Sequence, residues 1–336
     1  MNSKIMIIAP LMPLLLDKFE SEIYRNVLSD LRNYSKNTFQ IYDIGSFTLE
    51  IEIVSLNEIK KYYPNSLRPK FAKTFLKFSG NALIEPKKID NMYLVSNTEK
   101  KTIDYDSMIG IASAFFRELF KFQIRRLLIA ASIANAGIVR MYDGIIIQEN
   151  EYIGLAFKGV NGFINEARCD LIDLKWPPLE KIPLDTVVKW LEKNSITFDC
   201  NSKTAVERAI YAFTYISDEN VSTPEAILLW SLMGLESLYC TQQSASKSEQ
   251  LREKSQSYLG RAPNQASIML KRLYKARSEF VHGKMNIRPS FYYEEQDIVR
   301  DLLLDSAFLG VLLLTSSMQK MIIEDRSNLL FNWSIQ

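Results

Sequence analysis

A change in hydrophobic spacing near Ser202 constrains the fold of this chain more than any other feature. From that point apolar residues recur every three or four positions, which is typical of helices that pack by one face. Ser-Thr-Pro at 222–224 followed by Glu225 marks a helix start, and Gly283 suits the left-handed residue that closes a helix. The pattern predicts a helical bundle over residues 202–217, 223–240, 246–259, 263–282 and 291–323.

The first 195 residues or so alternate strand-like and helix-like segments instead. Helical spacing over 19–34 and 106–136 predicts two helices. The dipeptide Asn161-Gly162 is typical of a hairpin turn. We expect a mixed α/β domain, with strands rich in β-branched and aromatic residues at 5–8, 47–54, 93–95, 144–148 and 152–157.

A proline-rich segment at 175–183 predicts a domain boundary or a rigid connection, because proline restricts itself and the residue before it. The helix expected over 184–193 fits the first half as well. A chain of 336 residues is also longer than one hydrophobic core usually needs. We therefore expect an α+β multidomain protein, with a mixed α/β domain at 1–196 and an all-α domain at 197–336.

The cysteines and the single histidine restrict the chemistry. Cys169, Cys200 and Cys240 share no C-x-x-C spacing, and His282 is the only histidine. Neither a disulfide framework nor a thiolate or multi-histidine metal site is expected. We expect no cofactor and no metal in a cytoplasmic protein, although an all-carboxylate magnesium site stays open.

No membrane segment is expected. Residues 1–16 begin with an apolar run, but Pro10 and Pro13 interrupt it and an acidic stretch follows, so a buried first strand and turn is favoured over a secretory signal. The most apolar segment, 302–314, is short and contains Asp305.

Arg277 lies on the apolar face of the helix expected over 263–282. At about 100° per residue, Leu270, Leu273, Phe280 and Val281 fall within about 60° of it. A charge on a buried face needs a partner, or a position that another molecule covers.

Glu236 is the candidate partner, because it lies among apolar residues of the helix expected over 223–240. A structural ion pair between these two helices is one interpretation of Arg277. His282, in the last turn of the same helix as Arg277, favours a second interpretation, since histidine is the side chain best suited to proton transfer near neutral pH. A helix-terminal histidine that bonds a free carbonyl is the simpler alternative.

The segment Arg277-Ser278-Glu279-Phe280-Val281-His282-Gly283 resembles the R-x4-H motif of the HEPN superfamily. The V-H-G ending is typical of the ApeA-like branch of that superfamily, and the segments 273–278 and 235–239 are similar to it too. The resemblance covers residues 200–325. Another HEPN branch has a tyrosine two residues after the histidine, where this chain has Lys284.

The resemblance implies a metal-independent endoribonuclease that acts as a homodimer, with the Arg and His of both subunits in one cleft. Arg277 would hold phosphate oxygens and His282 would move protons. Ser278 and Glu236 would support them. Proteins of this kind include effectors of antiviral defence and toxins, and residues 1–196 would then act as a sensor or regulator that answers to an unknown activator or inhibitor.

The charge distribution agrees with an RNA partner. Basic residues outnumber acidic ones by ten to three over 246–290, in a chain whose net charge is +2. A solvated helix face explains this excess equally well. The residues expected to contact RNA are Lys271, Arg272, Lys275 and Lys284.

Two alternatives remain open at this point. Some HEPN domains serve only as interaction modules, in which case Arg277 would be the structural ion-pair partner of Glu236. A second cluster at Arg117, Lys121, Arg125 and Arg126 indicates either another nucleic-acid surface or, more simply, an amphipathic helix.

Overall fold

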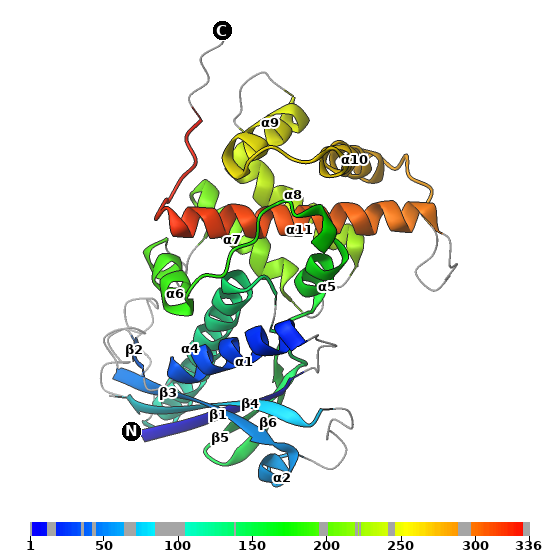
Figure 1. Cartoon of the computed structure of the whole chain (residues 1–336). Helices are drawn as coiled ribbons and strands as arrows, with labels where there is room; N and C mark the ends of the chain where they lie inside the picture. Colours follow the sequence, from blue (N-terminus) through cyan, green and yellow to red (C-terminus); the bar gives the residue numbers. More distant parts are fainter. Residues whose placement is uncertain are drawn as a thin grey trace. The chain divides into compact units, whose positions relative to one another are not determined.

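A computed structural model describes residues 2–11, 18–34, 37–41, 45–63, 72–84, 105–137, 139–194, 201–218, 221, 223–240, 246–287 and 297–331. The chain forms two compact units, shown in Figure 1. One consists of Met1–Leu128 and Val139–Val160, and the other of Ile129–Ile138 and Asn161–Gln336. The expected combination of a sheet-containing N-terminal half and a helical C-terminal half is confirmed.

The first unit contains an antiparallel sheet of six strands among the described residues, in the order β2-β3-β4-β1-β5-β6. Its central strand, β1, is buried along most of its length. The strands expected near the N-terminus, at 47–54, at 144–148 and at 152–157 are all present, whereas 93–95 lies outside the described residues. The strand bounds are Asn2–Pro10 (β1), Thr38–Ile41 (β2), Gly45–Ser55 (β3), Thr74–Ile84 (β4), Gly144–Gln148 (β5) and Glu151–Phe157 (β6).

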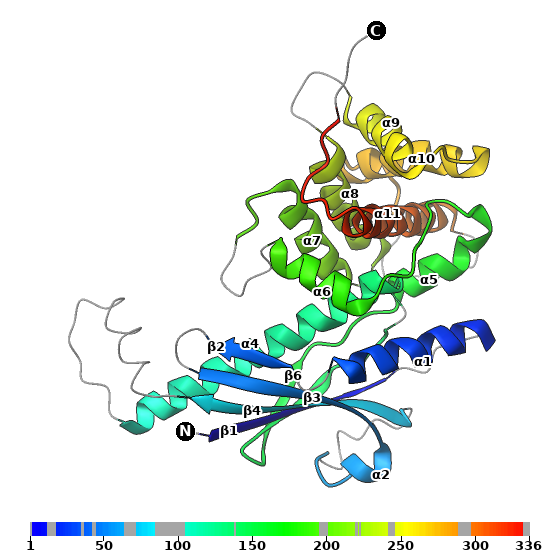
Figure 2. The same cartoon turned by 60° about the vertical axis from the view of Figure 1, so that its left-hand side comes forward.

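Helices cover both faces of this sheet. Figures 1 and 2 show α1 (Lys18–Asn33) and α4 (Tyr105–Ala134) on one face and the short α2 (Leu56–Ile59) on the other. Phe47 of β3 packs against Phe116 and Phe120 of α4, with ring centroids 5.5 and 5.7 Å apart. The opposite face holds a second apolar cluster that includes Phe75 and Tyr63.

The prediction of a hairpin turn at Asn161-Gly162 is wrong. The turn between β5 and β6 lies at Glu149-Asn150, where both residues have positive φ, as this kind of hairpin turn requires. Asn161 instead precedes α5 (Phe163–Asp170), and its side-chain amide donates hydrogen bonds to the carbonyl oxygens of Ile216, Asp218 and Val221. Asn161 therefore holds the segment that follows α7 through side-chain hydrogen bonds and does not form a hairpin turn.

The second unit is helical, and each helix expected after residue 184 has a counterpart. The last of them begins at Ile298 rather than at 291, and residues 291–296 lie outside the described part of the chain. The long α11 is buried along its middle, and α8 packs against it through two close approaches. A Cβ at Gly310 would lie 3.0 Å from that of Ser231, and one at Gly234 would lie 2.9 Å from Leu314. The helix bounds are Leu184–Lys193 (α6), Ala205–Ile216 (α7), Pro224–Tyr239 (α8), Lys247–Leu259 (α9), Asn264–Val281 (α10) and Ile298–Ile323 (α11).

The proline-rich segment at 175–183 is fixed on α11. The side chain of Gln319 bonds both the N–H and the carbonyl of Glu180, and the Ser316 hydroxyl donates to the carbonyl of Pro178. The ring of Phe163 of α5 also packs against that of Phe308 of α11, tilted by 53°, with centroids 4.8 Å apart. Because residues 161–194 pack with α11 in this way, the two units divide the chain at different positions from the boundary expected near 196.

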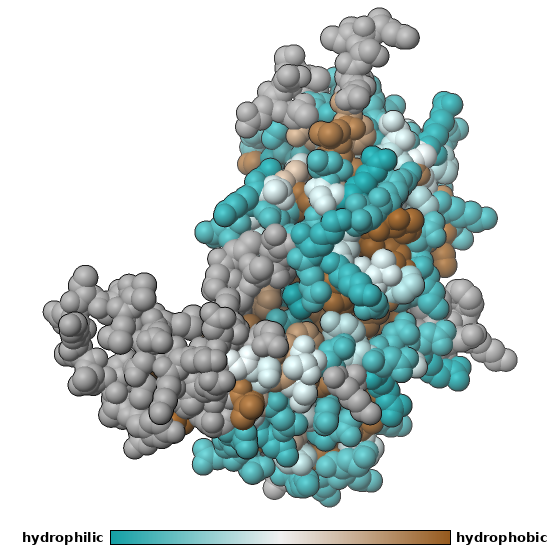
Figure 3. Space-filling view, turned by 90° about the vertical axis from the view of Figure 1, so that its left-hand side faces the viewer, coloured by the Kyte–Doolittle hydropathy of each residue, from teal (hydrophilic) through white to brown (hydrophobic). Residues whose placement is uncertain are grey.

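No helix in the described part of the chain is both long and apolar enough to cross a bilayer. On the face drawn in Figure 3, apolar residues lie in separate groups among hydrophilic ones.

Candidate functional site

The helix that carries the candidate motif, α10, packs on the bundle through one side and leaves its last turn at the edge. Leu270, Leu273 and Ala276 are buried, whereas Val281 is 47% exposed. The helix closes as expected: Gly283 has φ +64°, and its N–H donates to the carbonyl of Phe280 at 3.1 Å.

Arg277 is half-buried where the apolar face of α10 leaves the bundle. The predicted apolar face is therefore real over its first turns and partly exposed at its end. Among the described residues, no hydrogen bond or ion pair involves the Arg277 guanidinium.

The predicted ion pair between Glu236 and Arg277 is not formed. Other groups bind both Glu236 carboxylate oxygens: Oε2 lies 2.8 Å from Nζ of Lys247 on α9, and Oε1 accepts a 2.7 Å hydrogen bond from the hydroxyl of Tyr274 on α10. The Glu236 side chain is only 16% exposed. Glu236 thus joins α8, α9 and α10 without contacting Arg277 directly.

The electrostatics of this cluster keep its charges in their usual states. Burial raises the pKa of Glu236, but the hydrogen bonds from Lys247 and Tyr274 outweigh it, so that the net shift of this pKa is downward. The charge of Arg277 lowers the same pKa further. Burial and the Glu236 carboxylate raise the pKa of Tyr274, so the phenol stays protonated and donates the hydrogen bond. Burial likewise raises the pKa of the neighbouring Cys240 thiol to about 11.

His282 is exposed at the C-cap of α10, with φ −90° and ψ 9°. Its backbone N–H bonds the carbonyl of Ser278 at 3.1 Å, and Ser278 is half-buried. No hydrogen bond joins the His282 and Arg277 side chains, and five helical residues separate their directions by about 140° around the axis. Within one chain, the structure places the two groups on one helix end without bringing them together.

The four residues expected to contact RNA are exposed. Lys271, Arg272 and Lys275 lie on α10 and Lys284 follows it. Lys275 lies 3.6 Å from the carboxylate of Glu279, and the charge of Arg272 acts to lower the pKa of Asp305.

Other members of the basic excess at 246–290 serve the fold. Lys247 binds Glu236, and Lys254 is buried beside Gln250. Arg288 lies outside the described residues.

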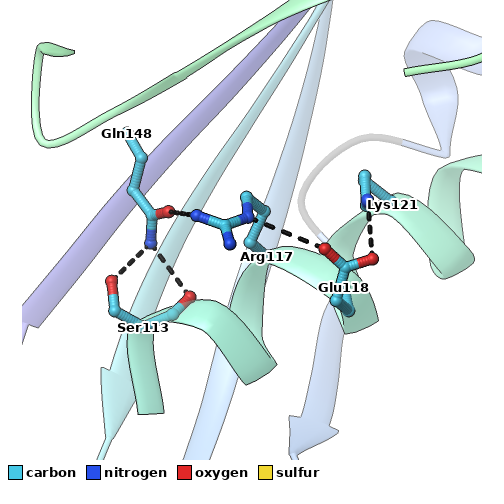
Figure 4. A network of polar contacts seen from close by, with 5 residues as sticks. All are labelled: Ser113, Arg117, Glu118, Lys121 and Gln148. Carbon is cyan, nitrogen blue, oxygen red and sulfur yellow. Dashed lines mark hydrogen bonds and ion pairs between the residues drawn. The ribbon is translucent and has the colours of Figure 1, made fainter. Parts of the chain in front are cut away.

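The basic residues of α4 have structural contacts, as the amphipathic-helix interpretation predicts. Figure 4 shows Arg117 reaching Gln148 of β5 at 3.2 Å and Glu118 at 3.6 Å, while Lys121 pairs with Glu118 at 2.6 Å. Arg125 donates to the carbonyls of residues 158 and 159.

Tyr274 and Lys247 are site residues that the sequence did not reveal. Tyr274 lies three positions before Arg277, a spacing that puts both side chains on neighbouring parts of a helix surface. That spacing could have identified Tyr274 as a neighbour of Arg277. Lys247 comes from a separate helix, and no local pattern connects it with Glu236.

No cluster of three or more histidine, cysteine, aspartate or glutamate residues that could hold a metal ion occurs among the described residues. No protein-family model, curated protein or solved structure matches this chain. The resemblance to HEPN proteins therefore rests on the motif residues of α8 and α10 alone.

Proposed function

We propose that this protein is a metal-independent endoribonuclease of the HEPN type, in which Arg277 and His282 act on the scissile phosphate. One observation carries the proposal. Arg277 is half-buried one helical turn after Tyr274, and both oxygens of the Glu236 carboxylate that Tyr274 binds are taken by Tyr274 and Lys247. A phosphate oxygen pair is the kind of ligand that a planar guanidinium in this position would bind.

The reaction follows from the two side chains. The 2′-oxygen of the RNA attacks the neighbouring phosphorus, its proton leaves, the bond from phosphorus to the 5′-oxygen breaks, and a proton reaches that 5′-oxygen. Histidine side chains can remove the first proton and deliver the second. Arginine stabilises the charge that develops on the phosphorane oxygens. The products are a 2′,3′-cyclic phosphate and a 5′-hydroxyl.

A homodimer supplies the second histidine that this scheme uses. Each chain has one histidine, and helical geometry directs it away from Arg277 of the same chain. Exposed apolar residues lie close to the motif in sequence or on α8: Leu229 and Met233, then Val281 and Ile287. Apolar residues of this kind are common at the centre of interfaces between identical subunits.

The biological role proposed here comes from the resemblance. We place the protein in the cytoplasm as a defence or toxin-type effector, with the sheet-containing unit as the part that receives an activating or inhibiting signal. A non-catalytic HEPN module is the alternative, and it predicts that His282 is dispensable for every activity.

The test is RNA cleavage in the presence of a chelator. The wild-type protein, Arg277→Ala, His282→Ala and Arg208→Ala are compared, the last being an exposed arginine of α7 that serves as a matched control. We expect cleavage to fall at least about 100-fold in the two motif variants and to stay unchanged in the control. Equal cleavage by all four proteins, or none by the wild type, would favour the interaction module instead.

A further inference from the structure

The Glu236 carboxylate stands between two possible partners on α10, Tyr274 and Arg277. Tyr274 holds Oε1 through a 2.7 Å hydrogen bond, whereas no ion pair joins Arg277 to either oxygen. Arg277 lies three positions after Tyr274 on α10, a spacing that puts the two side chains on neighbouring parts of the helix surface. An ion pair from Arg277 to Oε1 would have to share that oxygen with the hydrogen bond from Tyr274.

Removal of the tyrosine hydroxyl would leave this oxygen unpaired in a position that is only 16% exposed on the glutamate side. A buried carboxylate oxygen without a donor is costly, and the nearest mobile cation would take the vacant position. Arg277 is the candidate, because it lies three positions after Tyr274 on α10 and Lys247 already binds Oε2 at 2.8 Å. A guanidinium held by Glu236 is neutralised and turned away from an incoming phosphate.

We propose that Tyr274 is a positioning residue, which occupies Glu236 and so keeps Arg277 free to bind the RNA phosphate. This inference rests on the proposed function. It assigns Glu236 a role opposite to that of an ion-pair partner, because the carboxylate stays near Arg277 without holding it. Lys247 has the same role on the other oxygen.

The experiment uses Tyr274→Phe, which removes one hydroxyl from a half-buried ring. Tyr258→Phe is the matched control, since Tyr258 also donates to a carboxylate, that of Glu324 at 3.2 Å, on another part of the bundle. We expect Tyr274→Phe to lower kcat/KM for RNA cleavage at least about tenfold, mainly through KM. The slope of log(kcat/KM) against log salt should become shallower by about one unit, because one phosphate contact is lost. Tyr258→Phe should change neither quantity.

Rescue provides the decisive comparison. The double variant Tyr274→Phe/Glu236→Gln carries an uncharged amide that cannot capture Arg277, so cleavage and salt slope should return to within about threefold of wild type. Lys247→Met, which frees the other oxygen by changing a side chain that is 60% exposed, should reproduce the loss. Wild-type kinetics in Tyr274→Phe, or a loss that the double variant does not recover, would overturn the inference.

A second measurement separates this inference from the proposed function. If the wild type cleaves no RNA, the coupling between Glu236 and Arg277 is measured by double-mutant cycles of unfolding, once in the wild-type background and once in Tyr274→Phe. A larger coupling in Tyr274→Phe supports the capture of Arg277 without any reference to catalysis. Equal couplings contradict it.

Discussion

Single polar side chains fix the helical unit at points where backbone groups would otherwise be buried without partners. Gln319 of α11 is fully buried, and its amide bonds three backbone groups: the N–H of Glu180 at 2.8 Å, the carbonyl of Glu180 at 2.7 Å and the carbonyl of Ile133 at 2.7 Å. One side chain thus attaches both the proline-rich segment and the end of α4 to the central helix.

Gln319→Leu should destabilise the protein by about 3 kcal/mol, because a leucine of similar size leaves these buried backbone groups unpaired. Urea unfolding followed by circular dichroism measures the change. Gln265→Leu, at an exposed position of α10, is the control and should lie within about 0.5 kcal/mol of wild type. A loss at Gln319 no larger than the loss at Gln265 would show that the three bonds contribute nothing net.

The candidate site shows how far individual residues can be predicted from sequence. Helical spacing predicted that Arg277 lies on the apolar face of its helix, and Gly283 predicted that the helix ends at His282. That Arg277 is only half-buried was not predicted. The partner of Arg277 was not predicted correctly, because Glu236 binds other donors, Lys247 and Tyr274. Lys247, which takes one of its oxygens, comes from a helix whose placement no local pattern determines.

At the scale of elements, helices were more predictable than strands. The bounds expected for α6 were correct at both ends, since its apolar spacing is regular. Strand β4 was missed because Lys77, Ser79, Gly80 and Asn81 interrupt its apolar pattern. The packing explains why a glycine occupies position 80 of this strand, because a Cβ there would lie 2.5 Å from Cε2 of Phe120.

Gly80→Ala should therefore cost about 2 kcal/mol of stability, because the added methyl overlaps the Phe120 ring and lies 3.0 Å from Ile5. Thermal unfolding measures it. Gly110→Ala on α4 is the matched control, because nothing lies within 4 Å of the Cβ it would add. Alanine is the better helix former, so this control should be stabilised by up to about 1 kcal/mol. Equal effects of the two substitutions would refute the close contact at Gly80.

At the scale of the whole molecule, the proposed activity needs two chains. Met233 on α8 is 51% exposed and lies one turn before Glu236, on the side of the helix that approaches Tyr274. A charge at this position would be buried by a second copy docking there.

Met233→Glu should weaken the dimer at least about tenfold and reduce RNA cleavage in parallel. Light scattering after size exclusion, over a range of protein concentrations, gives the oligomeric state. Ile268→Glu is a matched control, since Ile268 is also 51% exposed but lies on the opposite side of α10 from Arg277. A monomeric wild type, or a dimer that both variants leave intact, would contradict an interface at this surface.

The division of the chain into two units was only partly accessible from sequence. The change from mixed to helical spacing is real, but residues 161–194 pack on α11, which follows them by more than a hundred positions. Contacts at such separation leave no mark in local periodicity. The proline-rich segment was recognised as unusual, and its role as a fixed connection on α11 required the fold.

The chemistry of the RNA ends tests the central claim most directly. RNA is treated with the purified protein in chelator, and the new termini are identified. We expect 5′-hydroxyl ends and 2′,3′-cyclic phosphates, or the monophosphates formed by their hydrolysis, and we expect Arg277→Ala and His282→Ala to yield neither. New ends that carry a 5′-phosphate, or the same ends in the same yield from His282→Ala, would contradict it.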